Sequence, residues 1–306
     1  MRSEIVVVGS LNADLVTRLE RFPAPGETVT AKGFAIHPGG KGANQAYAAA
    51  RLGGRVAMLG CIGRDAYGER LLQSLLSAGV DVSPVNRDAE APTGLALITL
   101  DASGENQIVV VPGANARLTP ELVQASEARI AAAAVVLLQL EVPLGAVLAA
   151  ARIARDGGAA VILDPAPAQP LPASLLKCVD FLTPNQGELQ TLTGRAVGKQ
   201  AEHAARSLAD GSPLRVIVKM GDAGALLVEA NGRAFWPALR VEAVDATGAG
   251  DAFNAALAVA LAEGRPLPEA GRLAVAAGAL CVTRAGAQPS MPTRQEVETA
   301  LARPST

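Results

Sequence analysis

Short apolar segments alternate with longer helical segments along this chain from about residue 119 onward. The apolar segments have the length and the Val, Ile and Leu content of strands buried on both faces of a sheet. The expected strands are 134–140, 159–163, 180–183 and 215–219, and the expected helices are 119–131, 143–155, 187–193, 199–210, 268–283 and 293–302. This alternation predicts an α/β fold in which a doubly wound, mostly parallel sheet lies between two helical layers, as in Rossmann-like proteins.

The other strand-like segments divide into two groups. Residues 5–9 and 55–60 are apolar and fit the main sheet, and so does a hairpin at Asn231-Gly232. Residues 11–37 and 93–111 instead combine Val- and Thr-rich pieces with turn residues. We expect these two stretches to form a small sheet inserted between parts of the main one. No linker interrupts the chain, so all 306 residues are expected to form a single domain.

Composition and charge argue against several classes of function. The net charge is −2, which gives no electrostatic reason to expect binding to nucleic acid or to an anionic membrane. The longest nearly apolar run, 130–140, is far shorter than the ~20 residues of a membrane span. The three cysteines are widely spaced and the chain has two histidines, so neither a disulfide framework nor a His-rich metal centre is expected. These features favour a cytoplasmic protein.

Residues 241–254 indicate a short strand at 241–244, a turn of small residues and the start of a helix. The turn Thr247-Gly248-Ala249-Gly250 has almost no side chains, so its backbone N–H groups can approach a ligand closely. The positive end of the helix favours an anion at this point. A carboxylate at Asp251 is useful there if it acts as a base beside a phosphoryl group. The alternative is that Asp251 only caps the helix, which is a common role for aspartate.

A second glycine-rich helix start lies at 37–45. It is not a P-loop, because Lys41 is followed by glycine, and no dinucleotide-binding Gly-x-Gly-x-x-Gly follows a strand. Upstream, Asn12 and Asp14 would point the same way on an extended segment, or they could form a turn. Together with Lys41 and with Asn44 in the first turn of the helix, they make a polar cluster able to hold a polyhydroxylated acceptor.

Polar residues also follow one expected strand after another. They are Glu141, Asp164, Asn185, Lys219 and Asp251. Each alone could be an ordinary loop residue, but strands of an open α/β sheet present their carboxyl ends at one edge, where ligands bind. This edge, the anion site and the polar cluster together predict phosphoryl transfer, with Asp251 as the base and the backbone of residues 249–251 stabilising the transferred group. Mg²⁺ would be held largely by phosphates and water.

The sequence resembles the ribokinase-like carbohydrate kinases from about residue 5 to residue 292. The motifs that carry the resemblance are Gly9–Asp14, Pro25–Thr30, Gly39–Ala46, Gln139–Glu141, Asp164–Pro167, Thr183–Asn185, Asp245–Asp251 and Thr283–Ser290. The resemblance implies ATP-dependent phosphorylation of D-ribose at O5 and a homodimer that pairs through a lid, the small sheet of 11–37 and 93–111. It leaves open a sibling kinase of deoxyribose, a nucleoside, fructose or a keto-deoxy sugar acid, and more remotely a sugar sensor without activity.

Roles for individual residues follow from the same resemblance. For the sugar, it implies contacts by Asn12, Asp14, Gly40, Lys41, Asn44, Ala96, Val110 and Glu141, with Asp251 as the base. For ATP, it implies contacts by Asn185, Lys219, Gly221, Asp222, Gly224 and Gly250, with Gly248, Ala249 and Gly250 as the anion hole. Glu188 matches an Asn-x-x-Glu motif that is tied to Mg²⁺, and Val275 stands where some relatives place a polar residue near adenine.

The resemblance also implies activation by a monovalent cation, usually K⁺. Its expected ligands are the Asp245 side chain, backbone carbonyls near Thr247, Cys281, Arg284 and Gly286, and the Ser290 hydroxyl. Oxygen ligands of this kind suit a hard cation. Without the resemblance, Asp245 would be interpreted as a turn residue that caps its loop.

Overall fold

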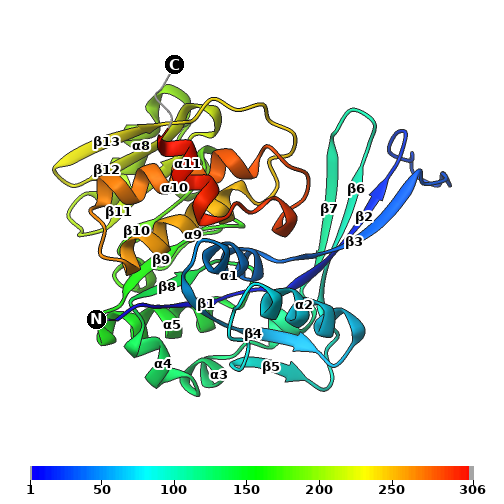
Figure 1. Cartoon of the computed structure of the whole chain (residues 1–306), viewed down its shortest axis with the longest axis horizontal. Coiled ribbons are helices and arrows are strands. Elements are labelled where there is room, and N and C mark those ends of the chain that lie inside the picture. The colour runs from blue at the N-terminus through cyan, green and yellow to red at the C-terminus, as the bar shows by residue number, and fades with distance from the viewer. Residues whose placement is uncertain (1, 303–306) are drawn as a thin grey trace.

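The structure is a computed structural model that describes residues 2–302, and one long sheet forms its centre (Figure 1). The strands of this sheet are β1 (Glu4–Val8), β4 (Arg55–Gly63), β5 (Val85–Asp88), β8 (Val135–Leu138), β9 (Ala160–Leu163), β10 (Phe181–Leu182), β11 (Arg215–Lys219), β12 (Gly224–Glu229) and β13 (Gly232–Pro237). Their order is β13-β12-β11-β10-β9-β8-β1-β4-β5. Neighbours from β11 to β5 are parallel, and the β12–β13 hairpin adds an antiparallel edge. The doubly wound, mostly parallel sheet is confirmed.

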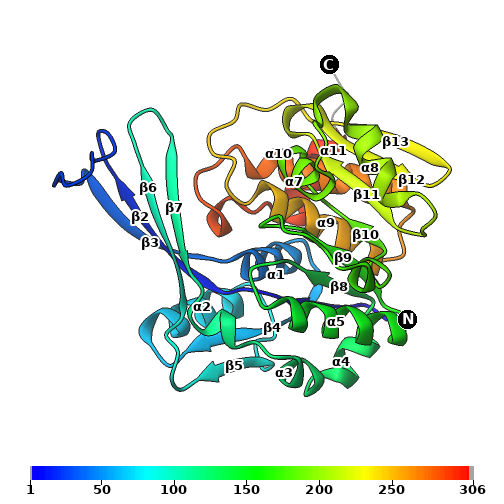
Figure 2. The ribbon, with the colours of Figure 1, turned by 180° about the vertical axis from the view of Figure 1, so that it is seen from behind.

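Helices cover both faces of this sheet. The layer in front in Figure 1 contains α1 (Lys41–Arg51), α2 (Ala66–Ser77), α9 (Ala249–Ala262), α10 (Leu267–Cys281) and α11 (Arg294–Ala302). The layer seen from behind in Figure 2 contains α3 (Pro120–Gln124), α4 (Glu127–Ala132), α5 (Leu144–Gly157), α6 (Ala173–Leu176), α7 (Gln186–Thr193) and α8 (Ala201–Ala209). Alternate residues of β1 pack into the two cores: Ile5 and Val7 toward the first layer, and Val6 and Val8 toward the second.

The chain reverses its direction of travel across the sheet at β1. From β1 it passes to β4 and β5 on one side, and it then returns to β8 on the other side. In open α/β sheets, the carboxyl ends of the strands form a ligand-binding crevice at such a point. Ser10, which follows β1, and Glu141, which follows β8, lie at this crevice and are hydrogen-bonded to each other.

Two expectations about secondary structure are wrong. Residues 241–244 form no strand, because the β12–β13 hairpin already occupies that edge of the sheet. They belong to a loop with exposed Val241 and Val244, held by a hydrogen bond from the Val244 N–H to the Val282 carbonyl (2.7 Å). The single helix expected at 119–131 is two helices, α3 and α4, because the chain turns between them.

A second, four-stranded sheet projects from the main body (Figures 1 and 2). Its strands are β2 (Asn12–Arg18), β3 (Gly33–Gly39), β6 (Gly94–Leu100) and β7 (Asn106–Val111), in the order β3-β2-β6-β7. Asp14 lies beside Ala96 in the pairing of β2 with β6, and Ala96 lies beside Val110 in the pairing of β6 with β7. These three side chains therefore share one face. Within residues 2–302, no helix combines the length and the apolar character needed to cross a membrane.

Candidate active site

Asp251 lies in the first turn of α9, but it does not cap the helix. The N-cap is Gly248, whose φ of 81° is a left-handed conformation that suits glycine, and no side chain caps this helix end. The Ala249 N–H donates to the Ala246 carbonyl within the turn (3.2 Å). The backbone N–H groups of Gly248, Gly250 and Asp251 are therefore the ones available to a ligand at the start of α9. The Asp251 side chain is only 6% exposed and points away from the helix end, toward α1. The capping alternative is wrong.

Two carboxamides of α1 hold the Asp251 carboxylate. Asn44 donates from Nδ2 to Oδ2 (3.1 Å), and Gln45 donates from Nε2 to Oδ1 (3.1 Å). Burial raises the pKa of Asp251 to about 6, against the positive charge of Lys41 and with the help of the negative charge of Asp164. A carboxylate with such a pKa is charged at neutral pH and is basic enough to take a proton from a hydroxyl during a reaction.

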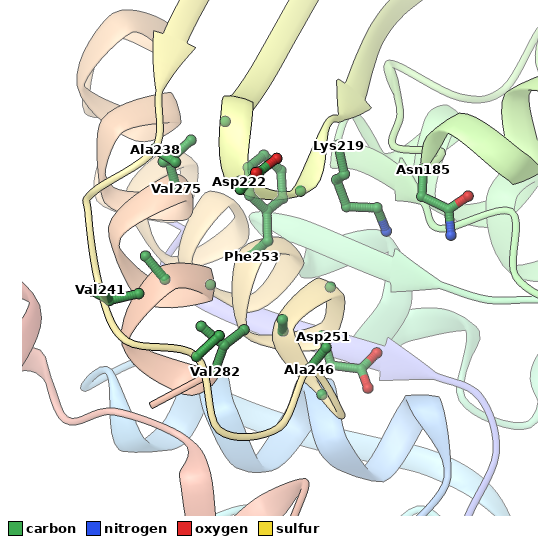
Figure 3. Close-up of a pocket in the computed structure, with 18 of the residues that line it drawn as sticks. Asn185, Lys219, Asp222, Ala238, Val241, Ala246, Asp251, Phe253, Val275 and Val282 are labelled. Carbon is green, nitrogen blue, oxygen red and sulfur yellow. The ribbon is translucent and has the colours of Figure 1, made fainter. Parts of the chain in front are cut away.

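A cavity of about 750 Å³ opens next to Asp251. It extends from the carboxyl ends of β9 and β11 over the start of α9 to α10. Figure 3 shows Lys219 and Asn185 on one side of it, and Val241, Val275 and Val282 on the other. The cavity thus has a charged end beside Asp251 and an apolar end. A nucleotide, with charged phosphates and a flat base, has the same division.

The charged end of the cavity is held by an ion pair. Lys219 Nζ donates to Asp164 Oδ1 (2.8 Å), and the Asp164 side chain is 2% exposed. Lys219 also reaches the start of α9, since a Cβ on Gly250 would lie 3.2 Å from its Nζ.

Burial by itself lowers the pKa of Lys41, but the negative charges of Asp251, Asp164, Glu141 and Glu188 outweigh it and raise that pKa, so Lys41 stays charged.

All residues expected to contact ATP line this one cavity. They are Asn185, Lys219, Gly221, Asp222, Gly224 and Gly250, and Gly248, Ala249, Glu188 and Val275 line it as well. Asn185 and Glu188 also form a capping box at the start of α7: each side chain accepts from the backbone N–H of the other. Val275 lies on the apolar side of the cavity (Figure 3).

Lys41, which was expected to contact the sugar, lines the same cavity as the residues expected to contact ATP. Asp14, Asn44 and Glu141 lie around Asp251 outside the lining of that cavity. Asp14, at the start of the small sheet, lies near both Glu141 and Asp251. Burial, followed by these two negative charges, raises the pKa of Asp14 to about 7. Its carboxylate lies against Gly39, where a Cβ would come within 2.1 Å of Oδ2. Glu141 accepts from the Lys41 backbone N–H (3.0 Å). These residues around Asp251 therefore offer closely spaced oxygen acceptors, as sugar hydroxyls require.

Several residues expected around a monovalent cation lie close together. Asp245 accepts from the backbone N–H groups of Thr247 (2.9 Å) and Gly286 (2.8 Å). Burial opposes these bonds, but they prevail and lower the pKa of Asp245. The Cys281 thiol lies 2.9 Å from the Ser290 hydroxyl and 3.6 Å from the Thr247 carbonyl. The Arg284 side chain pairs with Glu296, which is compatible with the expected role of its backbone carbonyl.

The sequence did not single out several buried side chains of this site. Gln45 contacts both Asp164 and Asp251, and Gln139 contacts Gln45. Asn115 donates to the Asn12 side chain (2.7 Å) and so fixes the start of β2. The one available signal for Gln45 was its place beside Asn44 in a glycine-rich helix start. Nothing in the local sequence points to Asn115.

Comparisons with known proteins agree with this geometry. The model of the pfkB family carbohydrate kinases matches residues 2–294. The chain is 42% identical to a ribokinase of Haemophilus influenzae over 298 residues, which is 97% of each protein. It is 38% identical to a deoxyribokinase of Salmonella typhi over 296 residues, covering 96% of this chain and 97% of that protein. The structure of Arabidopsis thaliana ribokinase complexed with ribose and ATP superposes with a TM-score of 0.93 at 37% identity, covering 99% of this chain and 100% of that one.

Proposed function

Because this chain belongs to the pfkB family of carbohydrate kinases, we propose that it transfers the γ-phosphoryl group of ATP to O5 of D-ribose, giving D-ribose 5-phosphate and ADP. The observation that carries this proposal is the position of Asp251. It lies between a cavity with the charge distribution of a nucleotide and a group of acceptors suited to sugar hydroxyls. A sensor without activity would not need a buried base at this junction.

In the proposed reaction, the Asp251 carboxylate accepts the proton of the O5 hydroxyl. O5 then attacks the γ-phosphorus: the O5–P bond forms, and the bond to the bridging oxygen breaks with its electron pair going to ADP. Backbone N–H groups of Gly248, Gly250 and Asp251 stabilise the charge on the transferred group, while the Ala249 N–H remains bonded to the Ala246 carbonyl. Lys219 and Asn185 would bind the phosphates, while Asn12, Asp14, Gly40, Asn44 and Glu141 would hold the sugar. Ala96 and Val110 would cover it with apolar surface.

The described residues fit a Mg²⁺ ion that is bound mainly by the nucleotide. Within residues 2–302, no three His, Cys, Asp or Glu side chains are grouped so that they could hold a metal alone. Mg²⁺ in phosphoryl-transfer sites keeps several waters and binds phosphate oxygens, and when bound it neutralises their charge. Among the carboxylates that line the cavity, Glu188, which the resemblance ties to Mg²⁺, and Asp164 would bind its water shell.

A monovalent cation, for which we propose K⁺, fits between the loop that precedes α9 and the segment 281–290 at the end of α10. These two segments bring together the Asp245 carboxylate, the Ser290 hydroxyl and the Thr247 carbonyl oxygen close to the start of α9. Such oxygens suit a hard cation. The cation would act by fixing the loop that precedes the proposed anion hole.

The test of the function is ADP release from Mg-ATP with D-ribose, 2-deoxyribose, fructose or uridine, each in K⁺ and in Na⁺. We expect ribose to be used best and K⁺ to activate. Deoxyribose is the serious alternative because of the Salmonella typhi relative. A site that hydrogen-bonds a substrate hydroxyl rejects the analogue that lacks it by about 10⁴- to 10⁵-fold in kcat/KM. The ratio of kcat/KM for ribose to kcat/KM for deoxyribose therefore decides which of the two is the substrate. Turnover of another acceptor alone would refute the sugar but not the kinase chemistry.

We further propose a homodimer in which the small sheet acts as a lid. Cross-strand pairing places Phe34, Leu97, Val109 and Val111 on the face opposite Asp14, where they are 61, 41, 61 and 38% exposed. An apolar face beside the open edge strand β7 favours association with a second copy. A cytoplasmic location stays part of the proposal, in line with the three free cysteines.

Val109→Glu is expected to weaken this dimer at least about a hundredfold, because it buries an unpaired charge in each copy. Sedimentation or light scattering over a concentration series measures the dissociation constant of the dimer. Asn106→Glu adds the same charge on the other face at the tip of the sheet and should leave the dimer intact. A wild-type protein that is monomeric at all concentrations, or a Val109→Glu protein as dimeric as the wild type, would contradict the proposal.

A further inference from the structure

Gln45 joins two carboxylates of the site without facing the cavity. It lies on α1 and is fully buried. Its Nε2 donates one hydrogen bond to Asp251 Oδ1 (3.1 Å) and another to Asp164 Oδ2 (3.1 Å). An amide has two N–H donors, so both are used. A single carboxamide thus fixes the distance between Asp251 and Asp164.

The orientation of the Gln45 carboxamide is determined from its other end. Gln139 Nε2 donates to Gln45 Oε1 (2.6 Å), and both side chains are fully buried. Gln139 is in turn confined by Gly9, since a Cβ there would lie 1.9 Å from Gln139 Oε1. A flipped Gln45 would place its oxygen against two carboxylates and its nitrogen against an N–H donor. Only the observed orientation of Gln45 gives each carboxylate a donor and gives Gln139 Nε2 an acceptor.

We propose that Gln45 is a positioning residue for phosphoryl transfer, whose carboxamide holds the Asp251 carboxylate in its reactive orientation and ties it to Asp164. This rests on the proposed role of Asp251 as the base. Asn44 donates only to the second oxygen, Oδ2. Without Gln45, that one hydrogen bond would leave the carboxylate free to rotate. Asp164 is also paired with Lys219 at the charged end of the cavity. Gln45 therefore links the base to the side chain that would bind the phosphates.

The test compares Gln45→Met with Gln139→Met on whichever acceptor the wild-type enzyme uses. Methionine is similar in volume and has no N–H donor. We expect Gln45→Met to lower kcat about 10- to 100-fold, with much smaller changes in KM. Loss of a donor to the charged carboxylate should also move the acid limb of the kcat profile to higher pH. The ionisable groups around Asp251, namely Lys41 on α1, Asp164 after β9, Asp14 on β2 and Cys281 on α10, are unchanged in this variant.

Gln139→Met is the matched control, because it also removes a buried amide from the same chain of hydrogen bonds but leaves both bonds to the carboxylates. Thermal unfolding measures the structural damage of each variant. A smaller loss of kcat and an unmoved acid limb in Gln139→Met support the positioning role. Equal losses of kcat with equal acid limbs in the two variants would overturn it. If Gln45→Met does not fold, Gln45→Asn keeps the buried amide but is too short to reach both carboxylates. Wild-type kcat and acid limb in Gln45→Asn would then overturn the role.

Failure of the proposed base has a different signature. If Asp251→Asn keeps wild-type kcat, the base is wrong and the role of Gln45 falls with it. If Asp251→Asn is inactive while Gln45→Met equals the wild type in kcat and acid limb, the base stands and the positioning role is overturned. Loss of activity in both, with a shifted acid limb in Gln45→Met, supports both.

Discussion

Replacing Asp251 by asparagine is expected to lower kcat by about 10²- to 10⁴-fold, the usual contribution of a general base. The substitution keeps the size of the side chain and one oxygen acceptor for the donors of α1, but it removes the group that takes the proton. KM for ATP should change little, since Asn185 and Lys219 remain. Asp210→Asn, an exposed aspartate at the end of α8, is the matched control and should keep full activity.

The pH dependence of wild-type activity is a second test of Asp251 as the general base. The pKa of Asp251 in the ligand-free protein is raised by burial to about 6, so kcat/KM should fall as the pH falls through about 6 and the base becomes protonated. Ionisation of Asp251 has the opposite effect on the stability of the fold. A carboxyl group whose folded-state pKa is raised stabilises the fold fully below its unfolded value of 3.8, and this contribution is lost as the pH rises through about 6. Asp251→Asn should thus lose activity without losing stability at pH 8. A kcat/KM that stays constant well below pH 6 would contradict the assignment.

Gly40→Ala is expected to weaken sugar binding and to destabilise the fold. Gly40 has φ 87° and ψ 131°, a conformation that side chains rarely adopt. A Cβ there would lie 2.6 Å from the backbone nitrogen of Asn12 and 3.0 Å from the Ser10 carbonyl oxygen. Because these are backbone atoms, β2 would have to move at the point where it presents Asn12 and Asp14. We expect a loss of about 1–3 kcal/mol from strain and a rise in the sugar KM of about 10- to 100-fold.

Gly53→Ala separates the two causes of this effect. Gly53 has nearly the same φ, 85°, but nothing lies within 4 Å of a Cβ built on it. Gly53→Ala should therefore show the strain of a positive φ without a collision between the added Cβ and the backbone. Urea unfolding gives the stability of each variant, and initial rates give the KM for sugar and for ATP. If Gly40→Ala matches Gly53→Ala in both respects, close packing of Gly40 against β2 has no role in binding the sugar.

The class of fold could be predicted from the sequence because it depends on local patterns. Apolar segments of strand length alternate with helical ones, and this periodicity is present in every stretch of a few residues, whatever its partners. The same holds for the glycine-rich start of α9 and for the Asn231-Gly232 hairpin. The residues 241–244 show the limit of such patterns: they have the composition of a strand but no neighbouring strand to pair with. Whether an edge is free is a property of the whole sheet.

The sequence by itself therefore determined the alternating architecture and the two glycine-rich helix starts, and it singled out Asp251 as the proposed base. The tertiary structure alone decided which side chains hold that base. Gln45 meets Asp251 across 206 positions of the chain and Asp164 across 119. It also decided that Phe34, Leu97 and Val109 share one exposed face. Such contacts follow from the order and register of the strands, which arise from packing over the whole molecule and leave no mark on the residues adjacent in sequence.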